Sequence, residues 1–330
     1  MTQSYYLGAN SGEGFVSLYE DFPPAAEAFL HIIKGGPGTG KSGFMRAVGA
    51  AAEERGMEVH YVLCSGDPGS LDGVYLPALG LAWVDGTAPH VIEPRQFCAD
   101  SDYINLGRFC RGPLSKEDAQ EVHEIGRRHK ALYRRAYALL GAAAALEPGQ
   151  KEPDPETVRE ISALISEGLS GAGQGSGACS RRFLHAISCQ GELWLTEELF
   201  QLCTHIIRLD SPSLLDRAAQ EARRSGAELI LCPSPLCPDR TECVILPELQ
   251  LAFVERHWPA RVTINLDSSG PPDARDAEAA LLQKRLTELA VSHLRAAKLL
   301  HDEMEAVYKR YMDFPALTEY TQGQIDAIFA

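Results

Sequence analysis

The chain has 330 residues, and at roughly 100–200 residues per domain this length predicts two or three domains with a sizeable core. Hydrophobic residues make up 45% and charged residues 23%, which excludes collagen, a wholly disordered chain and a disulfide-stapled miniprotein. With 31 basic against 45 acidic residues the formal charge is −14, so a protein that wraps nucleic acid or coats an anionic membrane is not expected.

Targeting and metal signals are weak. The first residues lack the charged start and apolar core of a secretion signal, and the longest weakly polar run, 136–146, is too short to span a bilayer. We therefore expect a cytoplasmic protein. Nine cysteines form an odd set without paired C-x-x-C motifs, and the cluster Cys232, Cys237 and Cys243 lacks a fourth ligand at a standard spacing. We expect reduced thiols and no metal at this cluster.

A phosphate-binding loop is predicted near the start of the chain. Residues 29–34 are an apolar run of strand length, and the P-loop pattern G-x-x-x-x-G-K-S follows directly. Apolar residues at helical spacing then continue toward Gly56, a residue typical of a helix end. The expected nucleotide-binding residues are Gly35, Gly36, Pro37, Gly38, Thr39, Gly40, Lys41, Ser42 and Gly43.

The residue types of this loop fit phosphate chemistry. Glycines let backbone N–H groups turn inward at the positive end of a helix dipole, where a triphosphate is favoured. We expect Lys41 to reach the β- and γ-phosphates and the Ser42 hydroxyl to bind the Mg²⁺ that they carry. ATP and Mg²⁺ are the expected ligands, although the loop recognises phosphates and leaves the base undefined.

Further site residues are predicted at the same sheet edge. After a strand over 57–64, an apolar run at 79–84 ends in Asp85, and a carboxylate at this place holds Mg²⁺ through water in such proteins. Gly86 follows where many of them have a water-orienting glutamate, so hydrolysis needs another polar residue. Those expected on neighbouring loops are Asp67, Asp72, Thr87 and His90.

The chain repeats itself. Residues 44–84 align without gaps on 214–254 with eleven identities in 41 pairs, where chance gives about two or three. Residues 31–34 recur at 205–208, an offset of 174 that falls to 170 beyond the loop, so four residues are missing where a second P-loop would lie. The second copy has Leu-Asp-Ser-Pro-Ser at 209–213 and is predicted to be degenerate.

The similarity extends at both ends, with Tyr6-Leu7 matching Phe183-Leu184 and residues 104–106 matching 264–266. The fold predicted is α/β, a P-loop NTPase-type three-layer sheet duplicated in tandem, each copy followed by a helical arm. The arms are expected to pack on each other or on the sheets, with a partner-binding coiled coil as the alternative. The predicted divisions are 1–112 (active repeat), 113–170 (arm), 171–180 (linker), 181–270 (degenerate repeat) and 271–330 (arm).

Segments 35–42, 64–74 and 84–91 resemble an uncharacterised bacterial family of tandem-repeat P-loop ATPases, over nearly the whole chain. The resemblance implies ATP binding and hydrolysis, a phosphate role for Lys41 and Ser42, and a site role for Asp67, Asp72, Asp85 and His90. Family members commonly keep a P-loop in each copy. This chain departs from the pattern at 209–213, which puts a second nucleotide in doubt.

The leading functional prediction is a Mg²⁺-dependent ATPase with one working site and a regulatory second copy. The alternatives are a small-molecule or nucleotide kinase and a switch that binds ATP without hydrolysing it. Arg181 or Arg182 of the second copy is a hypothetical contributor to the site. We expect no membrane or nucleic-acid partner, while a protein partner through the arms stays open. The strand order is also open. The position of the Asp85 strand relative to the P-loop strand separates the kinase–GTPase branch from the ATPase branch.

Overall fold

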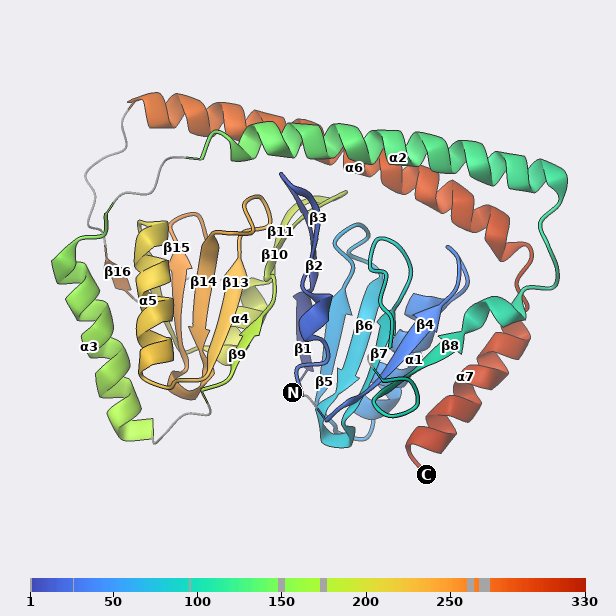
Figure 1. Cartoon of the computed structure of the whole chain (residues 1–330), viewed down its shortest axis with the longest axis horizontal. Helices are drawn as coiled ribbons and strands as arrows, with labels where there is room; N and C mark the ends of the chain where they lie inside the picture. Colours follow the sequence, from blue (N-terminus) through green and yellow to red (C-terminus); the bar gives the residue numbers. More distant parts are fainter. Residues whose placement is uncertain are drawn as a thin grey trace.

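The computed structural model describes residues 2–25, 27–94, 96–147, 152–172, 177–259, 264–266 and 274–330. The chain is a mixed α/β protein, as expected from the sequence. Two six-stranded sheets lie side by side, and a long pair of helices runs across both (Figure 1). We call residues 2–110 the first half and residues 179–266 the second half.

The sheet of the first half has the strand order β1-β5-β6-β7-β4-β8. Neighbouring strands are parallel except for β6, which runs antiparallel to both β5 and β7. The strands are β1 (Thr2–Tyr6), β4 (Phe29–Lys34), β5 (Val59–Leu63), β6 (Leu71–Leu76), β7 (Leu81–Asp85) and β8 (Ser101–Asn105).

Alternating apolar side chains give this sheet two buried faces. Helix α1 (Lys41–Glu53) places Phe44, Met45 and Val48 against one face. The opposite face is covered by the hairpin β2 (Gly8–Ser11) and β3 (Gly14–Ser17) with the segment that follows it.

The sheet of the second half has the order β9-β13-β14-β15-β12-β16, with β14 as its antiparallel strand. Its strands are β9 (Cys179–Arg181), β12 (His205–Leu209), β13 (Leu229–Pro233), β14 (Thr241–Leu246), β15 (Leu251–Glu255) and β16 (Ile264–Leu266). The strands β13, β14 and β15 are the counterparts of β5, β6 and β7. In each pair, both ends of the strand differ by the alignment offset of 170 residues.

The other elements of the second half occupy the same places as their counterparts. Helix α5 (Pro212–Arg224) covers one face, and the hairpin β10 (His185–Ser188) and β11 (Gly191–Trp194) with α4 (Thr196–Leu202) covers the other. The strands of this hairpin have the same lengths and the same spacing as β2 and β3. The two halves therefore have one strand order and one pattern of connections.

The halves meet at equivalent positions. The Tyr6 N–H donates to the Phe183 carbonyl at 2.9 Å, and the Phe183 N–H donates back to the Tyr6 carbonyl at 2.8 Å. One apolar cluster continues through this contact from the first half into the second. The two backbone hydrogen bonds are reciprocal, so the junction has a local two-fold character.

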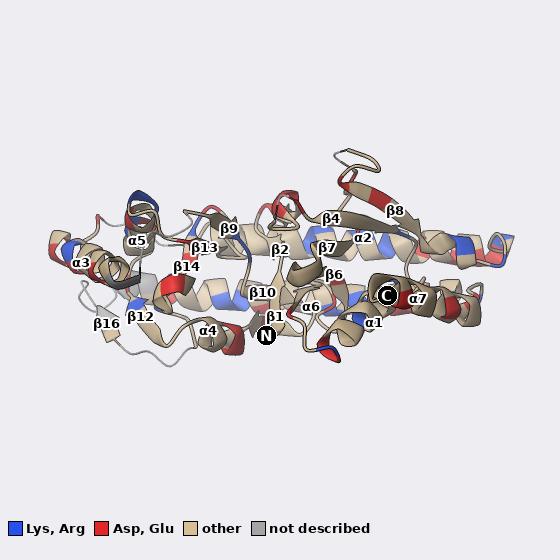
Figure 2. Cartoon of the chain, turned by 90° about the horizontal axis from the view of Figure 1, so that it is seen from below, with Lys and Arg blue, Asp and Glu red and all other residues tan. Residues whose placement is uncertain are grey.

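Two long helices form the arms. Helix α2 (Lys116–Ala144) begins at Ser115, whose hydroxyl accepts from the Asp118 N–H at 3.0 Å, and it lies beside α6 (Ala274–Lys309). Contacts join the start of α2 to the end of α6, as between Ser115 and Tyr311, and the other two ends through Glu147 and Gln283. The arms therefore pack on each other in antiparallel fashion (Figure 1). Basic and acidic residues both occur along the two helices (Figure 2).

Two further helices cover the sheets. Helix α3 (Pro155–Ala172) falls in the range predicted for the first arm, yet its Ile161 and Ile165 pack with α5 on the second half. Helix α7 (Phe314–Ile328) packs on α1 of the first half. Of the predicted linker 171–180, residues 173–176 lie outside the described residues, whereas β9 begins at Cys179.

Candidate functional site

The predicted phosphate loop connects β4 to α1. Gly38 and Gly40 have φ values of +69° and +89°, a backbone region that glycine enters without steric cost. The Thr39 hydroxyl donates to the Gly36 carbonyl at 2.8 Å and ties the loop across its own base. The loop thus has glycines at the two positions with positive φ and a hydrogen bond across its base. A curled backbone that binds an anion needs both features.

Lys41 is held over this loop. Its ammonium donates to the Gly35 carbonyl at 2.8 Å and to the Gly36 carbonyl at 3.0 Å. The carboxylate oxygen Oδ2 of Asp85 lies 3.5 Å from the same nitrogen. An ammonium group has three N–H donors. With two of them on backbone carbonyls, the third is available for a phosphate or for Asp85.

Asp85 reaches Lys41 because β7 is the direct neighbour of β4, with Ile33 opposite Asp85 in the register. Its Oδ1 accepts from both the backbone N–H and the hydroxyl of Thr87, at 2.9 and 2.5 Å. Burial raises the pKa of the Asp85 carboxyl, and Lys41 and Thr87 act in the opposite direction. The carboxylate is thereby fixed at the carboxyl end of its strand.

Ser42 and Asp85 fit the requirements of a Mg²⁺ site in part. The Ser42 hydroxyl accepts from the Leu71 N–H at 2.9 Å, so one lone pair and its own proton are left for other partners. Within the described ranges no group of three or more His, Cys, Asp or Glu side chains could hold a metal ion. A Mg²⁺ ion here would take most of its ligands from phosphate and water, which is how Mg²⁺ is usually bound beside nucleotides.

Asp72 and His90 form a second pair, which is buried. Their Oδ2 and Nε2 atoms are 3.1 Å apart, and the Tyr19 hydroxyl donates to the same oxygen at 3.1 Å. Burial, followed by the charge of Asp72, raises the pKa of Tyr19 well above its usual value. Asp72 was expected on a loop and lies instead within β6. Because β6 is antiparallel to its neighbours, its first residues reach the sheet edge where the other strands end.

Asp67 is separated from this cluster. It accepts from the Ser70 hydroxyl at 2.9 Å within its own turn and lies 3.4 Å from the ammonium of Lys298 on α6. Asp67 therefore links the sheet edge to an arm. Of the five residues predicted as catalytic, Lys41 and Asp85 lie together, Asp72 and His90 form the second pair, and Asp67 faces the arm.

The end of α6 and the start of α7 cover the loop, which the sequence did not predict. A Cβ on Gly38 would lie 2.9 Å from the Glu305 carbonyl, and one on Gly40 would lie 2.7 Å from a Leu317 methyl. The hydrogen bond from His301 and the neighbouring Lys309 lower the pKa of Glu305 to about 2. Both helices follow the whole second half in the chain, and a loop motif carries no signal for a contact so distant in sequence.

The second half has a shorter connection at the position of the predicted phosphate loop. Residues 35–40 connect β4 to α1, whereas only 210–211 connect β12 to α5. Glu255 ends β15 as Asp85 ends β7, but its cation is Arg240, which also contacts Glu147 after α2.

A buried pair of a histidine and a carboxylate occurs in both halves, but the histidine comes from a different element in each. His185 of β10 lies 3.1 Å from Glu242, the counterpart of Asp72, whereas His90 follows β7 in the first half. The second half thus keeps carboxylates at equivalent positions and pairs them with other side chains.

The two arginines proposed to complete the site are engaged elsewhere. Arg181 contacts Glu20 at 2.8 Å and Asp21 at 3.1 Å. Arg182 bonds Gln3 at 3.1 Å and stacks on the Tyr5 ring at 4.4 Å. Both lie at the junction of the halves beside β1, with three strands between β1 and β4. They are therefore structural residues of the junction and not part of the phosphate loop.

Comparison of the chain with protein-family models, with curated proteins and with solved structures found no match. Within the part of the chain that the structure describes, no helix has the combination of length and apolar character that crossing a membrane requires.

Proposed function

We propose that the first half binds a nucleoside triphosphate with Mg²⁺ at residues 35–43 and cleaves its terminal phosphoanhydride bond. The observation that carries this proposal is the position of Lys41, with its ammonium on two loop carbonyls and 3.5 Å from Asp85. A P-loop protein needs this arrangement of lysine, loop and strand-end carboxylate. The resemblance to tandem-repeat P-loop ATPases points to ATP.

We further infer that the chain is a tandem duplication with a degenerate second copy. The shared strand order and the matching ends of the paired strands support the duplication. The connection reduced to residues 210–211 supports the loss of the site. The second copy would then act on the first through the junction and through α6.

In this proposal the residues of the chain work by position and charge. Lys41 would place its third N–H on the transferred phosphoryl group. Ser42 and Asp85 would hold Mg²⁺, which offsets the negative charge of the phosphates. The buried pair Asp72 and His90 would keep the loop after β7 in place, because Pro89 and His90 follow Asp85 within that loop.

Transfer of the phosphoryl group to a small-molecule acceptor is the second candidate. The direct pairing of β7 with β4 is the strand order of the kinase–GTPase branch of P-loop proteins. Gly86 also stands where a water-orienting glutamate would be expected. A kinase would hydrolyse ATP slowly alone and turn over quickly when the acceptor is present.

The test is titration calorimetry with ATP and with GTP, in Mg²⁺ and in EDTA, followed by phosphate release in the same samples. We expect one site. Lys41→Ala should weaken binding about 10- to 100-fold, since a hydrogen bond to a charged group contributes ~1.5–3 kcal/mol. Ser42→Ala should remove the effect of Mg²⁺. Lys130→Ala, an exposed lysine on α2, is the control with the same charge change.

The outcomes separate the candidate functions. Binding with slow phosphate release supports the ATPase, whereas binding without release favours the kinase or a switch. If the wild type binds neither nucleotide, or if Lys41→Ala binds as well as Lys130→Ala does, the P-loop proposal is wrong.

A further inference from the structure

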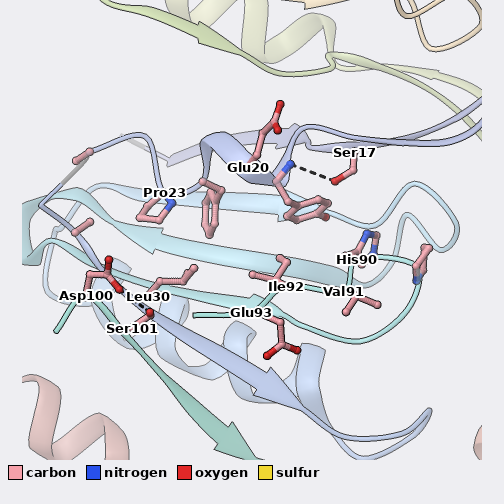
Figure 3. Close-up of a pocket in the computed structure, with 15 residues that line it drawn as sticks. Ser17, Glu20, Pro23, Leu30, His90, Val91, Ile92, Glu93, Asp100 and Ser101 are labelled. Carbon is pink, nitrogen blue, oxygen red and sulfur yellow. Dashed lines mark hydrogen bonds between the residues drawn. The ribbon is translucent and has the colours of Figure 1, made fainter. Parts of the chain in front are cut away.

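A cavity of about 430 Å³ lies on the sheet face opposite α1, away from the phosphate loop (Figure 3). Its volume is within the range of small-molecule sites. One wall is the segment after β3, the opposite wall is the loop after β7, and Leu30 of β4 lies between them. Ser17, Tyr19, Leu30, Pro89, His90 and Val91 are among its lining residues.

The second half has large side chains where this cavity opens. Trp194 stands at the position of Ser17, and Trp258 at the position of Ala88, next to Pro89. The two indole rings lie 5.1 Å apart, edge to face, and Trp258 is 1% exposed. At these two positions the second half therefore has large aromatic side chains in contact, where the first half has a serine and an alanine.

A basic residue of β4 or β12 bonds to the loop that follows β7 or β15, at different positions in the two halves. Lys34 donates to the carbonyls of Gly86 and Ile92, both at 2.9 Å. Arg208, the counterpart of Lys34, donates to the Trp258 carbonyl at 3.1 Å. The two loops differ in length, because residues 86–100 connect β7 to β8 whereas residues 256–263 connect β15 to β16.

The lining favours one kind of ligand. Aromatic, proline and aliphatic side chains offer an apolar surface, and no Lys or Arg is among the lining residues. The Tyr19 and Ser101 hydroxyls already donate to Asp72 and Asp100. The lining also carries the carboxylates of Glu20, Glu93 and Asp100, whose oxygens accept hydrogen bonds and are negatively charged. A matching ligand brings O–H or N–H donors and no negative charge, because buried anions need cationic or donor partners.

The cavity is connected to the phosphate site through a short stretch of backbone. His90 lines the cavity, and its N–H donates to the Thr87 carbonyl at 2.9 Å. Thr87 in turn holds Asp85 through two hydrogen bonds. A ligand against Pro89 and His90 would therefore touch the same loop that fixes the carboxylate beside Lys41.

We propose that this cavity binds a compact ring-bearing alcohol or amine as a second ligand of the first half. This binding does not require nucleotide, so it can be tested separately from the P-loop proposal. The ligand contacts the sheet face between the two walls and leaves the phosphate loop free.

Four probes with one ring and different polar groups test the proposal: benzyl alcohol, benzylamine, benzoate and phenyl phosphate. Binding is measured by saturation-transfer NMR and by titration on the full chain. We expect the alcohol or the amine to bind with a dissociation constant on the order of 1 mM, the range for a ligand of this size. Benzoate and phenyl phosphate should bind at least tenfold more weakly.

Ser17→Trp copies the side chain of the second half into the cavity at an exposed position and should weaken probe binding at least tenfold. Val91→Trp, at a rim residue that is 69% exposed, is the second filling variant. Leu281→Trp adds the same ring on α6, where the leucine is 70% exposed, and should change nothing. All three variants should give a cooperative urea unfolding transition like that of the wild type, which shows that they are folded.

Lys41→Ala should bind the probes normally, so failure of the phosphate site does not imitate failure of the cavity. The proposal is overturned if no probe binds, if all four bind equally, or if Ser17→Trp and Val91→Trp both bind the probes as the wild type does.

Discussion

His185 is a buried histidine with acidic neighbours on two sides. Its Nδ1 lies 3.1 Å from Glu242 and its Nε2 lies 3.6 Å from Glu192, and the Trp194 ring stacks on it at 3.5 Å. Burial acts to lower the pKa of His185, but the two carboxylates outweigh it and raise this pKa to about 9. The imidazole is therefore charged at neutral pH, although it lies in the core.

The first prediction concerns pH and stability. The folded-state pKa of His185 lies above the value of about 6.5 for an unfolded chain, so its stabilisation is complete below pH 6.5 and is lost as the pH rises through 9. We expect the free energy of unfolding in urea to fall by a few kcal/mol between pH 6.5 and 10. In His185→Gln this fall should be smaller.

NMR titration of the His185 ring gives an independent check of the same point. The prediction is contradicted if the His185 imidazole titrates near pH 6.5. It is also contradicted if the unfolding free energy of His185→Gln depends on pH as strongly as that of the wild type. The other charged groups that change over this pH range are present in both proteins and cancel in the comparison.

At the scale of elements, α7 closes the core beside the phosphate loop. Leu317 is 6% exposed, shares an apolar cluster with Phe44 and Leu106, and touches the position where a Gly40 side chain would start. Removing most of this side chain leaves a cavity next to the loop.

We predict that Leu317→Ala lowers the free energy of unfolding by about 2–4 kcal/mol, as for other leucines removed from a core. Leu281→Ala, which removes a 70% exposed leucine from α6, should cost less than about 0.5 kcal/mol. Urea unfolding measures both. Equal effects of the two substitutions would mean that α7 does not pack as the structure shows.

Local patterns predicted much of the first half. The apolar run at 29–34, the glycine loop and the following helix are dictated by neighbours in sequence, and β4 and α1 lie at the expected places. The strand ending in Asp85 followed from the same kind of pattern. Asp72 was assigned to a loop because turn-forming residues precede it, whereas the pairing of β6 with β5 and β7 extends the strand to Leu71.

Partners of helices could not be predicted in this way. An amphipathic pattern shows which side of a helix is apolar and not which surface will cover it. The contact of α3 with α5 and the cover that α6 and α7 provide for the loop both join segments distant in sequence. The cavity is also invisible in sequence, because Ser17 and Pro89 are brought together only by the packing of the hairpin on the sheet.

At the scale of the whole molecule, the arm that follows the second half lies on the phosphate loop of the first. The Glu305 carbonyl approaches Gly38, and Lys298 lies 3.4 Å from Asp67. A nucleotide in the loop would therefore change the surroundings of α6 and α7.

We predict that ATP with Mg²⁺ alters hydrogen–deuterium exchange at residues 303–320 and leaves α3, at 155–172, unchanged. The helix end and the loop share contacts, whereas α3 packs on the second half. Lys41→Ala should abolish the change. A uniform change along the chain, or none at 303–320 despite measured binding, would refute the coupling.

The closing of the first core by Met312, Leu317 and Ile325 has a consequence for synthesis of the protein. These side chains leave the ribosome only after the entire second half has been translated, long after Leu106, the last buried residue that the first half itself gives to this core. Until then the outer side of α1 stays open in the nascent chain, while the second half is made and can fold. The phosphate loop would thus reach its finished surroundings late, and exposed apolar surface would need protection by chaperones in the interval.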